Sequence, residues 1–365
     1  MTTTTVPKLR PLTIPRLLDE AVRLYRNNFL KFIGIIAIVQ IPLTLFQMVV
    51  SLIAFGDFFA TLESVGGPGG ATPDEIFGPS YFTGIGASSL LGILGFILIQ
   101  GVATAALTLA IAGSYLGEDI GILEAYQRLG RSWLSLIGAL ILAGIFGIAL
   151  FIWFLIPCVG WITGLGMLAF YWAIVVPLIP PVIVLEKQAA TQSIRRAWDL
   201  ARRKFWWVIG FVLALFMFNQ ITVTAPTTLV TFISQLIFGD PLAPTSAQLT
   251  IQTIIQSITT LLFSLIYLPL QLTAITLMYF DLRIQTEGFD MDVLSMGFMG
   301  ERTDVAQLVS QAPGVQQGNW FTINEMGYFV LLELGAVALL MAFYFLLALI
   351  GFLFFALMAA SGDFG

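Results

Sequence analysis

The chain has no histidine among its 365 residues and only one cysteine, Cys158. Without histidine it cannot form a Ser-His-Asp triad, a Cys-His pair, a histidine-ligated metal centre or a histidine proton relay. A lone cysteine cannot form an intramolecular disulfide, and Cys158 follows an apolar run, so we expect a small buried residue there. These absences argue against a self-contained hydrolase.

Charge is also scarce. Charged residues make up 10% of the chain and apolar residues 58%, with a mean hydropathy of +0.94, whereas soluble domains carry about 25% charged residues. Continuous apolar runs, rather than runs alternating at period two, favour membrane-spanning helices over a membrane β-barrel. We therefore predict an all-α polytopic membrane protein with about seven transmembrane helices, at residues 29–55, 84–113, 133–156, 159–185, 205–238, 249–280 and 327–358.

Basic residues are missing from every second connection between these spans. With a cytoplasmic N-terminus, all 16 Lys and Arg residues lie in or beside the segments 1–28, 114–132, 186–204 and 281–326. In the connections on the other side, every charged residue is acidic. Because cytoplasmic connections are enriched in Lys and Arg, we predict that the N-terminus is cytoplasmic and the C-terminus lies outside.

Three stretches resemble one another in residue class, namely 17–34, 121–138 and 193–210. Each has the apolar spacing of an amphipathic helix, with its basic residues on the other side, and each precedes two spans. We expect these helices to lie at the cytoplasmic interface, apolar face down and basic residues near anionic lipid headgroups. The prediction is a membrane domain 1–295 with three pseudo-repeats of interfacial helix plus transmembrane hairpin (about 13–113, 119–185 and 191–281). A cytoplasmic loop 296–326 and the seventh transmembrane helix 327–358 follow.

Three segments carry a resemblance to a known bacterial family: EAVRLYRNNF (20–29), PPVIVLEKQAATQSIRRAWDLARRKFWWVIG (180–210) and YFDLRIQTEGFD (279–290). The chain resembles the membrane domain named after glycerophosphoryl diester phosphodiesterases, which some members combine with a catalytic domain. That catalytic domain is a barrel that uses metal-binding acids and histidines. Since this chain has no histidine and no soluble stretch long enough for a barrel, the resemblance implies a stand-alone membrane domain in the bacterial cytoplasmic membrane, without phosphodiesterase activity or a cofactor.

The charged end of the sixth span is the first candidate site. Its acids could hold a cation or act in catalysis, but we predict no catalytic, cofactor-binding or metal-binding residue, because no positioned partner accompanies them. The structural interpretation pairs Arg283 with Glu287 at four-residue spacing, ends the helix at Gly288 in left-handed geometry, and places Asp281 opposite a basic residue of an interfacial helix. The candidates for that basic partner are Arg195, Arg196, Arg202 and Arg203.

Polar and kinked positions inside the spans form the second candidate set: Glu333, Gln271, Pro269, Pro177 and Gln40. Proline frees backbone carbonyls that could line a solute path, although neighbouring helices commonly satisfy them. Intramembrane amides could form a polar cavity or only hydrogen bonds between helices. Glu333 is a functional candidate because acids inside the membrane are costly.

The favoured function is a non-enzymatic membrane scaffold or accessory subunit that organises lipids or partner membrane proteins at the cytoplasmic face. The alternative is a transporter or channel for a small or lipidic solute, with a path near Pro177 and Pro269. A lipid-modifying enzyme is the least favoured. No base-reading motif or net basic patch indicates a nucleic-acid partner.

Overall fold

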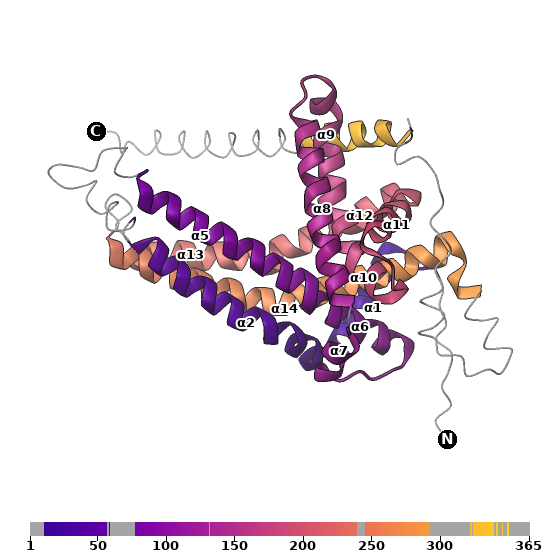
Figure 1. Ribbon diagram of the computed structural model, residues 1–365, viewed down its shortest axis with the longest axis horizontal. Coiled ribbons are helices and arrows are strands. Elements are labelled where there is room, and N and C mark those ends of the chain that lie inside the picture. Colours follow the sequence, from indigo (N-terminus) through magenta and orange to yellow (C-terminus); the bar gives the residue numbers. More distant parts are fainter. Residues whose placement is uncertain are drawn as a thin grey trace. The chain divides into compact units, whose positions relative to one another are not determined.

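The computed structural model describes residues 11–56, 58, 77–130, 132–238, 245–291, 322, 324–338, 341, 345 and 349. Every regular element in these residues is a helix (Figure 1). The elements are α1 (Ile14–Asn27), α2 (Phe29–Ala54), α5 (Pro79–Phe96), η1 (Ile97–Ala103), α6 (Thr104–Leu116), α7 (Ile122–Arg128), α8 (Ser132–Phe154), α9 (Val159–Phe170), η2 (Tyr171–Val175), α10 (Val176–Glu186), α11 (Ala190–Arg203), α12 (Phe205–Asn219), η3 (Gln220–Thr224), α13 (Ala225–Phe238) and α14 (Ser246–Glu287). The three η elements are π-helical segments inside longer continuous helices.

Six helices are long and apolar enough to cross a membrane: Phe29–Ala54, Tyr81–Leu116, Ser132–Phe154, Val159–Glu186, Phe205–Phe238 and Ser246–Glu287. They coincide with the first six predicted spans, and the chain is a multi-pass membrane protein. The predicted seventh span is described as helix over 327–338 and at three later positions, and the rest of it lies outside the described residues. The predicted loop 296–326 also lies outside them, apart from 322 and 324–326.

Close contacts divide the chain into two compact units. Unit 1 comprises Met1–Leu142 with Val175–Val315, and unit 2 comprises Ala143–Ile174 with Gln316–Gly365. Each unit has its own packing.

The core of unit 1 is the C-terminal part of α14. From Leu272 to Ile284 every residue of this helix is buried, as expected of a helix that is surrounded by other helices. Helices α1, α2, α6, α10 and α11 all contact α14. The run YFDLR therefore lies in the middle of the bundle, although it ends a predicted span.

The amphipathic helix α1 packs against α14 along its apolar stripe. Leu17, Ala21 and Tyr25 are buried, and the Tyr25 hydroxyl donates a hydrogen bond to the carbonyl of Ile266 at 2.8 Å. In the same way the Tyr126 hydroxyl of α7 donates to the carbonyl of Ile35 in α2 at 2.5 Å. The prediction that the apolar face of the first short helix rests on lipid is therefore wrong, because the protein itself covers that face.

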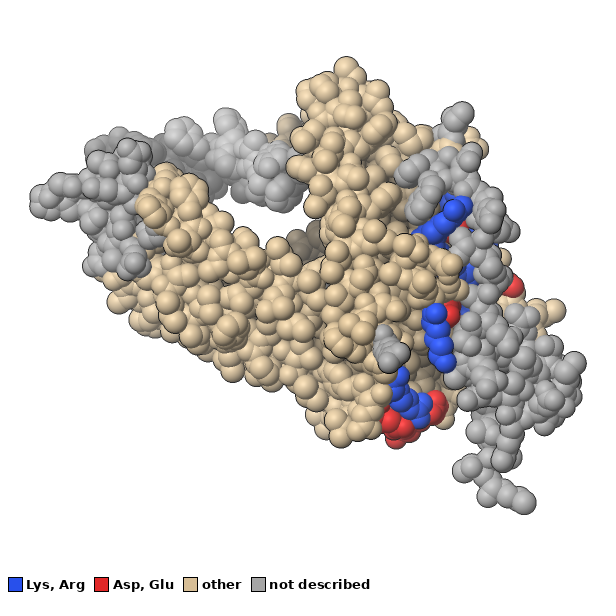
Figure 2. All heavy atoms as spheres, viewed as in Figure 1, with Lys and Arg blue, Asp and Glu red and all other residues tan. Residues whose placement is uncertain are grey.

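Charge is confined to one end of the unit 1 helices. Beyond Lys31, α2 has no charged residue, and α14 has none before Asp281. On the face shown in Figure 2, the basic and acidic side chains gather near α1, α7 and α11, while α5 and the part of α2 beyond Lys31 are uncharged. This segregation is what a bilayer requires, because a charged side chain in its apolar centre is costly.

Unit 2 contains the hairpin that α9 forms with the part of α8 from Ala143 to Phe154. Two helices, rather than one kinked helix, are present, and the turn between them holds Cys158 at a φ of +66°. A Cβ added at Gly160 would collide with the backbone carbonyl of Trp153, so only glycine allows this close return. The prediction that Cys158 is buried is wrong: the side chain is exposed, since a tight turn leaves it uncovered.

The same unit holds Glu333, which was predicted from the sequence as a candidate intramembrane acid. Glu333 is buried, and its Oε2 accepts a hydrogen bond from the backbone N–H of Gly166 at 3.4 Å. Beside it, the rings of Phe170 and Phe329 meet edge to face. The carboxyl group therefore has a backbone partner within its own unit.

Candidate functional site

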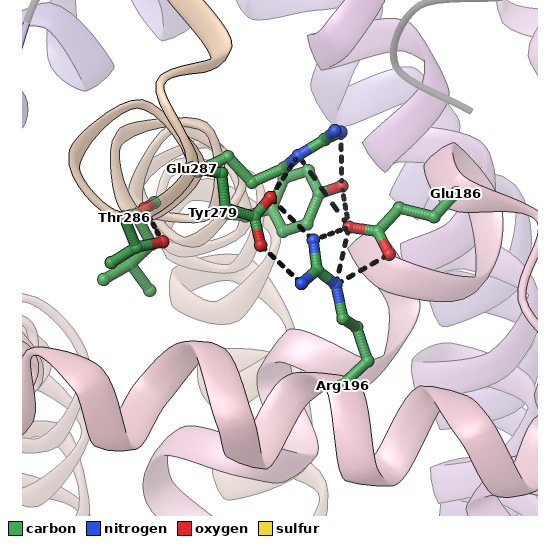
Figure 3. Close-up of polar contacts among 7 residues, drawn as sticks. Glu186, Arg196, Tyr279, Thr286 and Glu287 are labelled. Atoms are coloured by element: carbon green, nitrogen blue, oxygen red, sulfur yellow. Dashed lines mark hydrogen bonds and ion pairs between the residues drawn. The ribbon is translucent and has the colours of Figure 1, made fainter. Parts of the chain in front are cut away.

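An ion-pair cluster joins three elements of unit 1 (Figure 3). Glu186 is the last residue of α10, and Arg196 lies in the middle of α11. Lys187, at a φ of +53°, turns the chain sharply between these helices, so that the two side chains meet. The third element is α14, where Tyr279, Arg283 and Glu287 follow one another at four-residue spacing and therefore share a face.

Arg196 occupies the centre of the cluster, between the two carboxylates (Figure 3). Its Nε donates to Glu186 Oε2 at 3.0 Å and its Nη2 to Glu287 Oε2 at 2.7 Å. A further hydrogen bond joins Nη1 to Glu287 Oε1, which makes the contact with Glu287 bidentate. The guanidinium group thus bridges α10 to the end of α14.

Arg283 and Tyr279 close the cluster. Arg283 donates to Glu287 Oε2 at 3.3 Å and to the Tyr279 hydroxyl at 3.2 Å, and Tyr279 donates to Glu186 Oε1 at 2.8 Å. The guanidinium carbon of Arg283 lies 4.5 Å from the centre of the Phe289 ring, within the range of a cation–π interaction.

The four charged side chains are almost completely buried, with exposed fractions between 0 and 6%. Two arginines and two glutamates give a net charge of zero, which limits the cost of removing them from water. Burial alone would lower the pKa of Arg196, but the hydrogen bonds that Arg196 donates to Glu287 and Glu186 outweigh this effect and raise that pKa above its ordinary value. The guanidinium therefore stays charged.

Both carboxylates are engaged by donors on several sides. Glu186 accepts from Arg196 and Tyr279, and Glu287 accepts from Arg196 and Arg283. A general base needs to reach the proton of a substrate, whereas these oxygens face the protein's own donors. The geometry supports a structural clamp between α10, α11 and α14.

Two of the local predictions are confirmed. Arg283 pairs with Glu287 four residues later, and Gly288 ends α14 in left-handed geometry at a φ of +70°. Arg196 belongs to the clamp as predicted, although its partners are Glu186 and Glu287 rather than Asp281.

Asp281 is held in a different way. Its Oδ1 accepts the backbone N–H of Leu12 at 2.8 Å, and its Oδ2 accepts the side-chain amide of Gln285 at 2.6 Å. Two residues correspond to about 200° around a helix, so Asp281 lies on the opposite face from Tyr279 and Arg283. The basic residue that interacts electrostatically with Asp281 is Lys204, which directly follows α11, rather than one of the four predicted arginines, because this face meets the chain before α1.

The other predicted arginines are placed elsewhere on α11. Arg202 pairs with Asp199 at 2.8 Å, Arg195 is half-exposed and Arg203 is exposed. Glu186 and Tyr279 are the members that the sequence prediction missed. The signals for them were an acid that ends the apolar run PPVIVLE, and a tyrosine four residues before Arg283.

A polar cleft of about 570 Å³ lies among α2, α5 and α14 in unit 1. Its lining follows helical spacing on each helix, and ten of the lining residues carry a hydroxyl or an amide while none carries a charge. The lining residues are Gln40, Thr44, Gln47, Met48, Ser51, Ser88, Leu91, Gly92, Ile99, Thr253, Gln256, Ser257, Thr260, Leu261 and Ser264.

Beside this cleft, α2 and α5 are in close contact. Gln47 donates its amide to the carbonyl of Leu91 at 3.1 Å, which joins α2 to α5. Gly95 lies next to this bond, and a Cβ there would come within 2.6 Å of Gln47 Nε2. Small residues commonly permit this approach between membrane helices.

Of the predicted intramembrane residues in unit 1, Gln40 lines the cleft and the other three do not. Pro177 lies in the first turn of α10, Pro269 is buried within α14, and Gln271 is half-buried two residues later. The sequence prediction missed the polar stripe of α14 from Thr253 to Ser264. Its signal was the recurrence of hydroxyl and amide residues every three or four positions in an otherwise apolar helix.

Within the ranges that the structure describes, no three His, Cys, Asp or Glu side chains lie together in a way that could hold a metal ion. Comparisons of the chain with protein-family models, with curated proteins and with solved structures find no match.

Proposed function

We propose that this chain is a non-enzymatic protein of the bacterial cytoplasmic membrane that organises anionic lipids, and with them partner membrane proteins, at its charged end. One observation carries the proposal. Four exposed cations of unit 1 have no acidic partner among the described residues: Arg16, Arg26, Lys187 and Arg203.

Other cations at the same end are neutralised internally. Arg23 pairs with Glu20 at 2.6 Å, and Arg128 pairs with Glu118 at 2.6 Å and with Glu124 at 2.7 Å. The four unpaired cations therefore remain for external anions, and a basic residue near an anionic membrane surface contributes about 1 kcal/mol of binding.

Exposed aromatic side chains support the placement of this end of unit 1 at the level of the lipid headgroups. Phe29 is 38% exposed and Trp206 is 50% exposed, and both stand where a short helix meets a span. Aromatic rings are favoured at the membrane–water interface. The positive-inside distribution supports a cytoplasmic location for this end and for the N-terminus.

The non-enzymatic part of the proposal rests on the clamp. Its carboxylates face arginine and tyrosine donors of the same chain, which favours a role in stability over acid–base chemistry. The resemblance of the segments around Arg196 and Arg283 to the glycerophosphoryl diester phosphodiesterase membrane domain agrees with a stand-alone membrane domain.

The order of elements supports the proposed repeats. Each of the short helices α1, α7 and α11 precedes two long helices that can span a membrane. Three copies of one unit would give three sets of basic residues on one side of the membrane, which suits a protein that gathers anionic lipid.

The test uses the full chain in phosphatidylcholine nanodiscs, with and without phosphatidylglycerol. We expect phosphatidylglycerol to raise the thermal unfolding temperature, and added salt to weaken that effect, because surface charges are screened. Changing Arg16, Arg26, Lys187 and Arg203 together to glutamine should remove most of the rise. The matched control, R23Q with R128Q, should retain it. An equal response of both variants would contradict the proposal.

Transport of a small or lipidic solute is the second candidate, and the polar cleft supports it. The test is the movement of a fluorescent neutral lipid between the leaflets of reconstituted liposomes. We expect the wild-type protein to accelerate this movement and Gln40→Leu to reduce it. A rate equal to that of protein-free liposomes would exclude this function for that lipid.

A further inference from the structure

We propose that the cleft among α2, α5 and α14 binds an uncharged, hydroxyl-rich group, such as a sugar or glycerol moiety. This inference goes beyond the proposed function, because the cleft is separate from the exposed cations and binding there does not require anionic lipid. The bound group belongs either to the headgroup of a neutral lipid or to a free solute, and the two share the same chemistry.

The lining selects against ions. A charged ligand would enter a site without any charged residue, and an unpaired charge in an apolar surrounding is strongly unfavourable. Ten of the fifteen lining residues nevertheless carry a hydroxyl or an amide group, in a cleft of about 570 Å³. That volume lies in the usual range of small-molecule sites, about 300–1,000 Å³.

Two buried polar atoms in the lining lack partners. Gln40 is only 7% exposed, and its Nε2 donates to Ser264 Oγ at 2.5 Å while its Oε1 has no hydrogen-bond partner in the described structure. Ser88 Oγ, on the opposing helix α5, also lacks a partner there. Buried polar atoms are nearly always hydrogen-bonded, so this pair indicates a site that a ligand completes.

Several groups in the lining offer free acceptors. The hydroxyls of Thr253, Ser257 and Ser264 each donate to a carbonyl of their own helix, at 2.8, 2.7 and 3.0 Å. Their oxygens retain lone pairs, and the free Oε1 of Gln40 adds another acceptor. Acceptors without charge match a ligand with several O–H donors.

The cleft lies away from the charged end. On α2, Gln40 follows the last charged residue, Lys31, by more than two helical turns, and the lining continues to Ser51 near the other end of the helix. On α14, Ser264 precedes Asp281 by more than four turns, and Thr253 lies farther still from it. On both helices the Gln40–Ser264 pair is the part of the lining nearest to the charged end. In the proposed orientation the cleft extends from there toward the outer leaflet, where a lipid headgroup or an external solute reaches it.

The test titrates the full chain, purified in a detergent without a sugar headgroup and placed in phosphatidylcholine nanodiscs. One arm adds a glucosyl diacylglycerol to the nanodiscs, and the other adds free maltose to the buffer. The readout is the half-saturating amount for the rise in thermal unfolding temperature. The variants are Gln40→Leu and, as a matched control, Gln271→Leu, which lies on α14 outside the cleft.

We expect saturable protection of the wild type and of Gln271→Leu by the glycolipid, with binding weakened about fivefold to tenfold in Gln40→Leu through the loss of one buried hydrogen bond. Gln40→Leu should be about as stable as the wild type without ligand, since the lost hydrogen bond to Ser264 is offset by the removal of an unpaired buried oxygen. Protection by maltose, with the same dependence on Gln40, supports the site and assigns it to a free solute. Absence of protection in both arms overturns the proposal and leaves a cleft that holds only water. Equal half-saturating amounts for Gln40→Leu and the wild type also overturn it.

Discussion

Replacing Arg196 with methionine is expected to destabilise unit 1 strongly. Arg196 is the shared partner of Glu186 and Glu287, and its side chain is 3% exposed. The change leaves two buried glutamates with one arginine, so the neutral cluster gains one net negative charge. Removing one partner of a buried ion pair costs about 3–5 kcal/mol, because the remaining charge is uncompensated.

The expected loss is measurable by thermal unfolding of the purified protein in detergent. A change of about 1 kcal/mol shifts the midpoint of a protein of roughly 150–250 residues by about 2–4 °C, so Arg196→Met should lower it by on the order of 10 °C. Arg203→Met is the matched control on the same helix. Its side chain is exposed, and surface substitutions usually change stability by less than about 0.5 kcal/mol.

A second substitution separates charge balance from lost packing. Glu287→Gln in the Arg196→Met background leaves Arg283 with Glu186 and restores a neutral cluster. We expect the double variant to be more stable than Arg196→Met alone, since neighbouring charges couple by about 0.5–3 kcal/mol. The clamp is refuted if Arg196→Met unfolds at the temperature of Arg203→Met, or if the second change lowers stability further.

Three further predictions concern other points of the fold. Gly160→Ala should destabilise the α8–α9 hairpin by about 1–3 kcal/mol, since the new Cβ meets the carbonyl of Trp153. Gly144→Ala, where no atom lies within 4 Å, should be neutral or stabilising, and equal melting temperatures of these two variants would contradict the close contact. Gly288→Ala should cost about 1 kcal/mol through its positive φ, and unchanged thermal unfolding would argue against the left-handed helix end. Burial raises the pKa of Tyr25 to about 12, so its neutral form stabilises the fold fully below about pH 10 and this contribution is lost as the pH rises toward about 12. Between about pH 10 and pH 12 the wild type should accordingly lose stability faster than Tyr25→Phe. Parallel profiles of stability against pH for the two proteins would contradict the raised pKa of Tyr25.

The features that could be predicted from the sequence depend only on residues close together in the chain. A bilayer requires about 20 consecutive apolar residues in a helix, so run lengths alone placed the six spans. The pair of Arg283 and Glu287 and the end of α14 at Gly288 depend only on helix geometry over a few residues. These features do not require knowledge of any distant contact.

Tertiary packing determines which charged side chains pair with one another. Asp281 and Glu287 are both acids at the same helix end, yet only Glu287 shares a face with Arg283 and reaches Arg196. Glu186 joins them because the turn at Lys187 brings α10 back against α11, which no local pattern specifies. The same limit applies to the apolar face of α1, which α14 covers in place of lipid.

The cleft depends both on the sequence of each helix and on the packing between helices. The sequence by itself determines that nearly all charge lies at one end of the spans, and it contains the uncharged polar stripes of α2 and α14 at helical spacing, although the stripe of α14 was not predicted. Only the tertiary structure decided that these stripes face one another and α5, and that Gln40 meets Ser264. The reason is that helical periodicity fixes which residues share a face, whereas side-chain packing between helices fixes which faces meet.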